Sequence, residues 1–212
     1  MRIIPASYEI LDPLNGPDIL KKIELCGRVC YKSEDCITND SAKKFVADII
    51  KRGHESVLEH FSFSVRFIVD RGVSHELVRH RIASFSQEST RYCNYGNDDD
   101  GCTFIWPLFW KEDKCKGSDI WKNATRKAEN SYELLLDAGA TPQEARSVLP
   151  NSLKTEVIMT ANLREWRHFL KLRTAKDAHP QMREVTVPLL AELKTLIPVV
   201  FEDILTTEEV VE

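Results

Sequence analysis

The chain has 212 residues, of which 42% are hydrophobic and 29% charged, and its formal net charge is −4. This length allows one large domain with a sizeable core, and the composition is ordinary for a globular protein. Because coating nucleic acid requires the neutralisation of many phosphates, a mildly acidic chain is not expected to bind it. With no membrane-length apolar run and no signal-peptide pattern, we expect a cytoplasmic protein without a membrane partner.

The six cysteines form no C-x-x-C pair, and no cluster of cysteine and histidine has the spacing of a zinc site. In a reducing cytosol such cysteines are free thiols. No cysteine has the setting expected of a catalytic thiol. We therefore predict free cysteines and no metal site.

In the first half of the chain, the pattern of apolar residues predicts a mixture of helices and strands. Residues 61–69 alternate apolar and polar side chains, which is typical of a half-buried strand. Pro5 favours an edge position for the opening strand, and Gly53 is a C-terminal helix stop. The predicted elements are a strand over 2–11, helices over 18–31 and 41–52, a strand over 61–69 and a helix over 73–82.

The second half of the chain contains stronger capping signals. Thr141, Pro142 and Glu144 form a capping box with proline at the first helical position, and Asn162 with Glu165 forms a second cap-like pair. The predicted elements are a surface loop over 93–102, a long helix over 119–138, a short helix ended by Pro150, a strand over 154–161, and helices over 162–173 and 180–196. We expect a single α+β domain over 1–212, with long helices packed on a small mixed or antiparallel sheet; an α/β fold stays open.

The most informative segment covers residues 79–92, with the sequence RHRIASFSQESTRY. Its arginines can offer paired hydrogen bonds to phosphate, and its serine hydroxyls supply further donors. A pocket for a nucleotide phosphate and a pyrophosphate needs this inventory. Arg79 and Arg81 also lie near a predicted helix end, where cations favour the helix dipole. From charge alone, a solvated basic helix end is the simpler interpretation.

A second polar group lies much farther along the chain. Arg146 falls in the capped short helix, and Asn162, Arg164, His168 and Arg173 follow the last predicted strand. Arg164 and His168 are four residues apart and therefore share a helical face. An amphipathic surface helix explains the same pattern, so the pattern alone does not establish a site.

A third fragment, HESVLEH, covers residues 54–60. Its histidines and glutamates suggest a metal, but their spacing is not that of the H-E-x-x-H motif. A helix-capping serine flanked by two structural histidines explains the fragment more simply.

Together, these fragments resemble the flavin-dependent thymidylate synthases. Arg79, His80 and Arg81, followed by seven residues and then Ser89, are similar to the signature of that family, and the similarity extends through Tyr92. It also covers HESVLEH upstream, and EARSVLP and ANLREWRHFLKLR downstream. The ordered set spans most of the chain, so it is far more specific than a lone Arg-His-Arg.

The resemblance implies reductive methylation of dUMP to dTMP in de novo thymidylate biosynthesis. It implies FAD as cofactor, NADPH as reductant and methylene-tetrahydrofolate as carbon donor, in a homotetramer whose active sites are shared between subunits. Matched by position, the residues for FAD are His54, Ser56, Arg79, His80, Arg81, Gln87, Asn162, Arg164 and His168. Those for dUMP are Glu76, Arg79, Gln87, Glu88, Ser89, Thr90, Arg91, Arg146 and Arg173.

Arg173 matches the family residue whose fixed charge stabilises the pyrimidine as its N3 loses a proton, and we expect it to be the catalytic residue. Ser89 is expected to donate or accept hydrogen bonds, because no general base is evident beside it. The chain departs from many members at Ser86, where they have Asn, and from some at Gln87 and His168, where they have Glu and Asn. Because Gln cannot titrate, the protonation chemistry near the flavin is less defined.

Two rival functions use the same residues, and a third, that of a structural interaction protein, would leave the clustered arginines unexplained. A flavoprotein could keep the FAD pocket and oxidise another substrate. A non-catalytic nucleic-acid-binding module could use the arginine-rich segment, although the acidic net charge argues against it.

Overall fold

The computed structural model describes residues 1–97, 101–110 and 115–206. These residues form two compact units, each assembled from separate stretches of the chain. Asp98, Asp99 and Asp100, which belong to the expected surface loop, lie outside the described residues. Unit 1 comprises Met1–Ser7, Phe67–Arg79 and Phe85–Ile158, and unit 2 comprises Tyr8–Arg66, His80–Ser84 and Met159–Glu212. The single domain expected over 1–212 stays a prediction.

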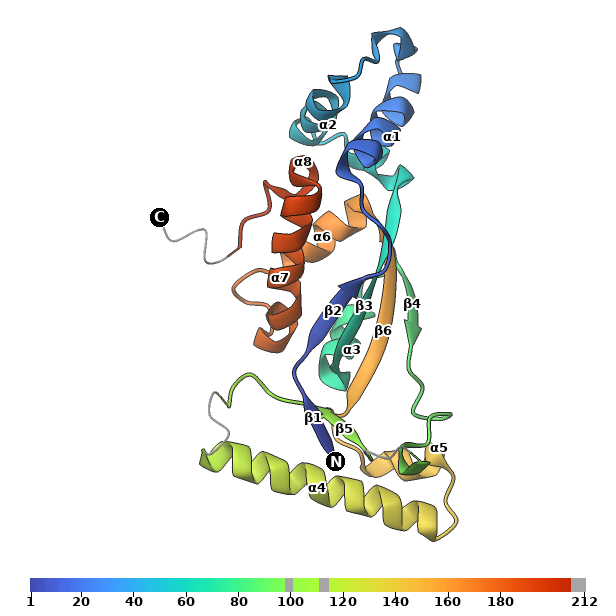
Figure 1. Cartoon of the computed structure of the whole chain (residues 1–212), viewed down its shortest axis with the longest axis vertical. Helices are drawn as coiled ribbons and strands as arrows, with labels where there is room; N and C mark the ends of the chain where they lie inside the picture. The colour runs from blue at the N-terminus through green and yellow to red at the C-terminus, as the bar shows by residue number, and fades with distance from the viewer. Residues whose placement is uncertain (98–100, 111–114, 207–212) are drawn as a thin grey trace. The chain divides into compact units, whose positions relative to one another are not determined.

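Helices and short strands both occur along the chain, which confirms the α+β class (Figure 1). The α-helices are α1 Gly16–Val29, α2 Ser41–Lys51, α3 Arg71–Leu77, α4 Lys116–Asp137, α5 Pro142–Ala145, α6 Leu163–Arg173, α7 Pro180–Leu196 and α8 Pro198–Phe201. The 3₁₀ turns are η1 Glu34–Cys36, η2 Glu55–His60, η3 Tyr95–Asn97 and η4 Arg146–Val148. The strands are β1 Arg2–Ile4, β2 Ser7–Ile10, β3 Ser62–Asp70, β4 Ser84–Gln87, β5 Thr103–Ile105 and β6 Lys154–Asn162.

The strands form two sheets. β1 and β5 pair in parallel, with Arg2 opposite Thr103 and Ile4 opposite Ile105. The second sheet has the strand order β2-β3-β6-β4, and the boundary between the units falls within each of its strands. The opening strand is thus two strands in different sheets. They are separated at Pro5, which has no N–H to continue a ladder.

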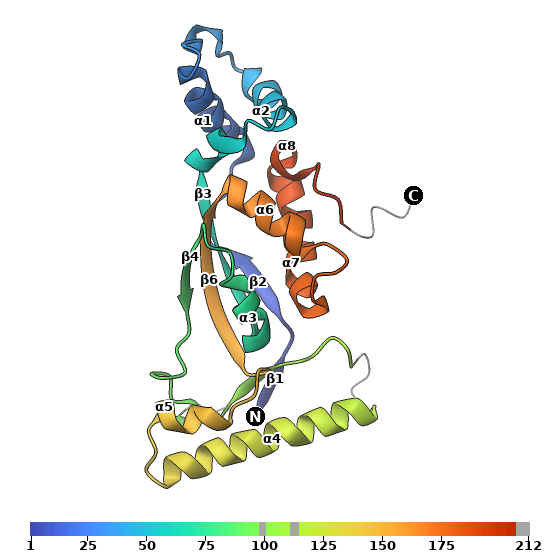
Figure 2. The same cartoon turned by 180° about the vertical axis from the view of Figure 1, so that it is seen from behind.

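Aromatic side chains hold helix α6 against strand β3 in unit 2. The rings of Phe63 and Trp166 stack with centroids 4.9 Å apart, and the indole N–H of Trp166 donates to the carbonyl oxygen of Phe63 at 3.1 Å. Phe169 meets Trp166 edge-on at 5.5 Å. All three side chains are buried, and burial of such a side chain stabilises the fold by about 2 kcal/mol. Helix α7 packs beside α6 (Figure 2), so α6 contacts both a strand and a second helix.

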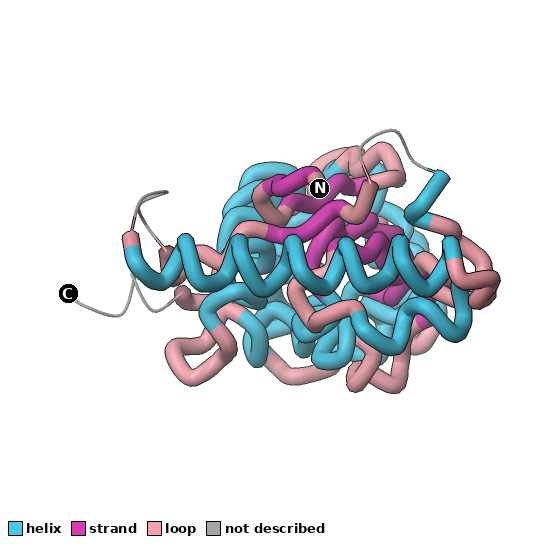
Figure 3. Tube along the Cα trace, turned by 90° about the horizontal axis from the view of Figure 1, so that it is seen from below, coloured by secondary structure: helices cyan, strands magenta, loops and turns pink. Residues whose placement is uncertain are grey.

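Unit 1 has its own apolar core beneath the long helix α4, which runs without interruption (Figure 3). The buried core residues are Tyr95, Cys102, Phe104, Tyr132, Ala145 and Leu153. The N-terminal ammonium of Met1 lies 2.9 Å from Glu129 Oε1, and the same oxygen accepts the backbone N–H of Cys102 at 2.9 Å. This buried carboxylate on α4 therefore fixes the start of β1 and the start of β5 together.

The helix predicted over 73–82 is wrong at its C-terminal end, because α3 stops at Leu77. The following residues leave the helix, and Ser84–Gln87 join the four-stranded sheet as β4. His80 is buried, with 6% of its surface exposed. Tertiary burial and strand pairing thus override the local helix pattern, and Arg79–Arg81 form a linking segment instead of a helix end.

The capping predictions are confirmed. Thr141 and Glu144 form the capping box of α5, and Asn162 Oδ1 accepts the backbone N–H of Glu165 at 2.9 Å. Gly53 has a φ of +72°, as a C-terminal stop requires. All six cysteines are free. Among the described residues, no helix is long and apolar enough to cross a membrane.

Candidate functional site

The sequence-derived site residues divide between the two units. Most of those matched to FAD belong to unit 2, and most of those matched to dUMP belong to unit 1. Unit 2 contains His54, Ser56, His80, Arg81, Asn162, Arg164, His168 and Arg173. Unit 1 contains Glu76, Arg79, Gln87, Glu88, Ser89, Thr90, Arg91 and Arg146.

In unit 2, a hydrogen bond joins the Arg-His-Arg segment to the end of helix α6. Arg173 Nε donates to His80 Nε2 at 3.0 Å, although the two residues are 93 positions apart in sequence. The other ring nitrogen, His80 Nδ1, lies 3.2 Å from Glu165 Oε1. The imidazole is therefore held between a guanidinium and a carboxylate.

Helix α6 is built for this arrangement. Glu165, Phe169 and Arg173 recur every four residues and so lie along one face of the helix. The ring of Phe169 meets His80 edge-on, with centroids 4.9 Å apart. His168 approaches from beside it, at 5.9 Å between ring centroids. The imidazole thus rests on Phe169, with its polar partners one turn away on either side.

Burial and neighbouring charge keep His80 neutral. Burial, followed by the charges of Arg173 and His168, lowers its pKa to about 4. Burial also raises the pKa of the Glu165 carboxyl, and His168 partly opposes that rise. A guanidinium can only donate, so His80 Nε2 must be an acceptor. The neutral ring then carries its proton on Nδ1 and donates it to Glu165.

A cavity of about 500 Å³ opens beside this cluster. Asn162, Arg164, His168 and Lys171 line it and offer hydrogen-bond donors or positive charge. The carboxylates on its wall are compensated: Arg164 Nη1 lies 2.6 Å from Glu59 Oε1, Arg167 binds Glu55, and Glu165 accepts from His80. The donor set therefore fits an anionic or amide-rich ligand of the size of a flavin portion.

The remaining FAD residues expected in unit 2 do not converge on that cavity. His54 lines a separate cavity of about 580 Å³, together with the basic side chains of Arg28, Lys44 and Arg52. Ser56 is exposed on η2, and Arg81 is exposed in the linking segment. The structure thus brings His80, His168 and Arg173 into one cluster, with Asn162 and Arg164 in the adjoining cavity.

In unit 1, two residues matched to dUMP meet across a long sequence separation. Arg146 Nη1 donates to Thr90 Oγ1 at 3.0 Å, over 56 positions. The capping box of α5 places Arg146 directly after the helix, in η4. Ser89 Oγ accepts the backbone N–H of Arg91 at 3.3 Å, so the segment curls on itself. The Arg146–Thr90 pair thus presents a guanidinium and a hydroxyl at one position, and both groups can donate to a phosphate.

Glu88 has an anchoring role in the same segment. Tyr95 donates to Glu88 Oε1 at 2.6 Å, and Lys154 Nζ donates to Glu88 Oε2 at 2.8 Å. Burial raises the pKa of the Tyr95 phenol, and its hydrogen bond to Glu88 raises it further. Burial alone would lower the pKa of Lys154, but its bonds to Glu156 and Glu88 outweigh that effect and raise it. Both Glu88 oxygens are thus engaged within the protein.

Gln87 is also tied to its own unit. Its side-chain amide donates to Ser74 Oγ at 3.0 Å and to Thr155 Oγ1 at 3.2 Å. These two bonds identify the nitrogen end of the amide, so the carbonyl oxygen is the end that can accept from a ligand. A glutamate at this position could not make both donations. Where some family members have Glu, this chain therefore has Gln87 together with two hydroxyl groups that accept from its amide.

Arg71 is a candidate that sequence reasoning missed. Its Nη1 is buried and has no hydrogen-bond partner among the described residues. Its charge opposes the rise in the pKa of Tyr95, so it lies near the Glu88 network. A buried guanidinium nitrogen without a partner fits an anionic ligand. In the sequence, the available sign of this role was that Arg71 directly follows the strand that ends at Asp70.

A metal is the alternative occupant of the unit 2 cluster. His80, Glu165 and His168 place one ligand atom each within 4.8 Å of one another, a donor set that zinc accepts. A metal on Nδ1 would require the ring proton on Nε2, where it would face the Arg173 N–H. The guanidinium would also repel the cation. The geometry favours a hydrogen-bond network, and the expected absence of a metal stays a prediction.

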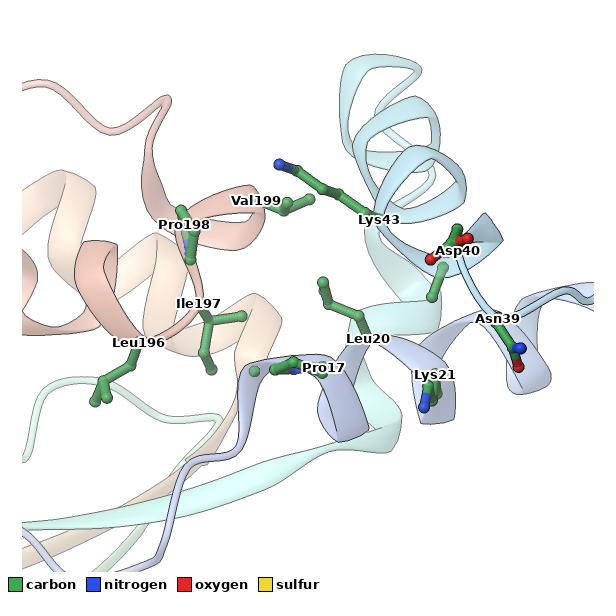
Figure 4. Close-up of a pocket in the computed structure, with 12 residues that line it drawn as sticks. Pro17, Leu20, Lys21, Asn39, Asp40, Lys43, Leu196, Ile197, Pro198 and Val199 are labelled. Carbon is green, nitrogen blue, oxygen red and sulfur yellow. The ribbon is translucent and has the colours of Figure 1, made fainter.

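Another cavity, of about 390 Å³, lies between α1, the start of α2 and the α7–α8 junction (Figure 4). Leu20, Ile197 and Val199 give it an apolar lining, with Lys21 and Lys43 beside them. None of the sequence-derived site residues lines it. It is therefore separate from the candidate site.

Comparison with known proteins agrees with the sequence signature. The sequence model of the family described as thymidylate synthase complementing protein matches residues 10–199. The chain is 34% identical over 194 residues to the flavin-dependent thymidylate synthase of Geobacter sulfurreducens, covering 88% of this chain and 82% of that one. It is 35% identical over 173 residues to that of Pyrococcus furiosus, with 81% and 70% covered. For Corynebacterium efficiens the identity is 32% over 212 residues, with 94% and 84% covered.

Proposed function

The chain belongs to the flavin-dependent thymidylate synthase family, and we propose from this premise that it converts dUMP to dTMP by reductive methylation. The observation that carries the proposal is the bond between Arg173 Nε and His80 Nε2 at 3.0 Å. It joins two fragments of the family signature, 93 positions apart in sequence, around one imidazole. A solvated basic helix end or an amphipathic surface helix does not account for this bond.

The chemical task is to activate uracil C5, which is a poor nucleophile. Loss of the N3 proton makes the pyrimidine anionic, and a fixed cation beside its edge stabilises that anion. We assign this role to Arg173. His80 is neutral, so its hydrogen bond with Arg173 does not cancel the positive charge of that arginine. No cysteine adduct is required, and Cys93 packs against the unit 1 core.

FAD, when bound, supplies the reducing equivalents for the transferred one-carbon unit. The cavity beside α6 fits such a group, because Asn162, Arg164 and His168 offer donors there. His54, Ser56, Arg79, Arg81 and Gln87 are assigned to FAD by family position alone. His168 contributes a ring nitrogen where some members have an amide, so it can donate in the same place.

The unit 1 residues are assigned to dUMP. Arg146 with Thr90 offers a guanidinium and a hydroxyl for the phosphate, and Glu88 holds the segment that carries Ser89 and Arg91. Glu76, Arg79, Gln87 and Arg173 complete the set by family position. Within unit 1, the role of these residues is to position the nucleotide.

NADPH as reductant and methylene-tetrahydrofolate as carbon donor belong to the same proposal, as do the homotetramer, its shared active sites and a cytoplasmic location. They rest on family membership. A homotetramer predicts a mass of four chains in light scattering at micromolar concentration.

The experiment is a reconstitution of the purified chain with FAD, NADPH, methylene-tetrahydrofolate and dUMP, with dTMP measured by chromatography. Formation of dTMP that requires all four components is the expected result. Oxidation of NADPH without dTMP would favour a flavoprotein with another substrate. No flavin absorption together with salt-sensitive binding to oligonucleotides would favour the nucleic-acid module and contradict the proposal.

A further inference from the structure

Glu165 is absent from the residues that the family signature brings to the site, yet it contacts the centre of the cluster. It is buried, with 7% of its surface exposed, and its Oε1 lies 3.2 Å from His80 Nδ1. Glu165 is the third residue of α6, and Asn162 accepts its backbone N–H. In a capping box, its side chain would accept the backbone N–H of Asn162 in return. Its carboxylate points to the imidazole instead.

Three side chains therefore form a chain of directed hydrogen bonds. Arg173 Nε–H donates to His80 Nε2, and His80 Nδ1–H donates to Glu165 Oε1. Each bond requires the other, since a proton on Nε2 would face the guanidinium donor and leave the carboxylate without one. The carboxylate thus selects the ring tautomer that can accept from Arg173.

We propose that Glu165 is a positioning residue for Arg173, acting through His80. A guanidinium is planar, so fixing the direction of its Nε–H bond also fixes the plane of its two terminal nitrogens. Glu165 and Arg173 lie eight residues apart, about 12 Å along the helix axis, and His80 bridges that span over Phe169. The rigid face of α6 thereby sets the orientation of the charge that faces the pyrimidine.

This inference rests on the proposed function, because it assigns an orientation to the activating charge. Its structural part is independent of turnover. The tautomer of His80 is a property of the protein alone, and it can be read from the nitrogen shifts of histidine in labelled protein. Those shifts show whether the hydrogen-bond chain from Arg173 through His80 to Glu165 exists, whatever the outcome for the proposed reaction.

The experiment compares Glu165→Ala with Glu165→Gln, which keeps an oxygen acceptor for Nδ1–H. We expect Glu165→Ala to lower kcat about 10- to 100-fold, by analogy with the loss of a carboxylate that orients a metal-binding histidine, with flavin content unchanged. Glu165→Gln should retain most of the rate. Glu133→Ala, which removes an exposed carboxylate from α4, is the matched control and should be unaffected.

In the parent protein, the nitrogen spectrum should show His80 with its proton on Nδ1, and Glu165→Ala should shift the ring toward a mixture of tautomers. If the parent protein forms dTMP and Glu165→Ala has the same kcat, the positioning role of Glu165 would be overturned while the proposed function stands. A proton on Nε2 in the parent would overturn it whatever the activity. Should Glu165→Ala fail to fold, the parental spectrum and the Glu165→Gln rate still decide.

Discussion

Two of the three arginines of helix α6 bind different kinds of partner. Near its middle, Arg167 is buried among carboxylates: its guanidinium lies 3.1 Å from Glu55 and 2.6 Å from Asp203, and it also donates to the carbonyl of Val200. At its C-terminus, Arg173 bonds a neutral imidazole at 3.0 Å. Carboxylates cancel the first charge, and the imidazole orients the second without cancelling it.

The difference teaches how to separate a structural from a functional arginine. Arg167 closes an ion-pair network that ties η2 and the residues after α8 to α6, which is a stabilising role. Arg173 is placed by a partner that can only accept while it is neutral. A neutral acceptor can orient an arginine without adding a countercharge of its own, which suits a site that stabilises a developing anion.

The largest expected effect comes from acid, which should disrupt the hydrogen bond between Arg173 and His80 before it disrupts the ion pairs of Arg167. Protonated His80 would present a donor to Arg173. Its pKa in the folded chain is about 4, against an ordinary value of 6.5. The folded state therefore resists a proton that the unfolded chain accepts below pH 6.5, and stability should fall between pH 6.5 and 4 by about 3 kcal/mol, at about 1.4 kcal/mol per pKa unit.

The groups facing this imidazole are Glu165, His168 and Arg173, all on α6. In contrast, the hydrogen bond from Arg167 holds the pKa of Asp203 below its usual 3.8, so that carboxylate stays ionised through the same range. A nitrogen-shift titration of His80, with urea unfolding at several pH values, tests the prediction. Titration of His80 near pH 6.5 would contradict it.

Next in size is the loss of the carboxylate-bound arginine. Arg167→Ala would leave Glu55 and Asp203 without their cation, and we expect a stability loss of about 2 kcal/mol. This lies below the cost of breaking a fully buried pair because the Asp203 side chain is 45% exposed. Urea unfolding at pH 7 measures it. An unchanged midpoint would mean that the network is not stabilising.

A smaller effect is expected in unit 1 from loosening Glu88. There the anchored group is a carboxylate, and Tyr95 and Lys154 hold it. Tyr95→Phe removes the 2.6 Å hydrogen bond to Glu88, which should loosen the segment carrying Ser89 and Arg91. We expect dUMP affinity to fall about tenfold, since a hydrogen bond to a charged group contributes about 1.5 kcal/mol. Calorimetric titration measures this. Tyr92→Phe, at an exposed tyrosine, is the control, and equal affinities in both variants would sink the idea.

The smallest expected effect on stability belongs to the third arginine of α6. Arg164 pairs with Glu59 at 2.6 Å, but about half of each side chain is exposed. Such pairs contribute below about 1 kcal/mol, so Arg164→Ala should leave the unfolding midpoint nearly unchanged. If Arg164 holds FAD as assigned, flavin retention should fall nonetheless. Unchanged flavin retention would remove Arg164 from the site.

Sequence patterns predicted the elements whose signals are local. Helix α7 has the bounds Pro180–Leu196 that its proline start and apolar stripe indicate, and the alternation of β3 appears as alternating burial. The short strands β4 and β5 were missed, since three or four residues carry little periodicity and their pairing partners are distant. The end of α3 was misplaced because burial of His80 is a tertiary effect.

The same limit applies to the site. Family position identified His80 and Arg173, but the contact between them spans 93 positions and depends on how α6 packs. Glu165 was interpreted as half of a helix cap, which is its local role, while its bond to His80 spans 85 positions. The residues that hold a site residue in place, such as Tyr95 and Lys154, carry no local signal of that role.

The central claim is that Arg173 supplies an oriented positive charge to the pyrimidine. The most direct measurement is single-turnover formation of dTMP by Arg173→Ala, with bound flavin measured by absorption in the same preparation. We expect the rate to fall by about 10² to 10³, the cost of losing one preorganised charge donor, while flavin stays bound. A near-parental rate with flavin bound would contradict the account.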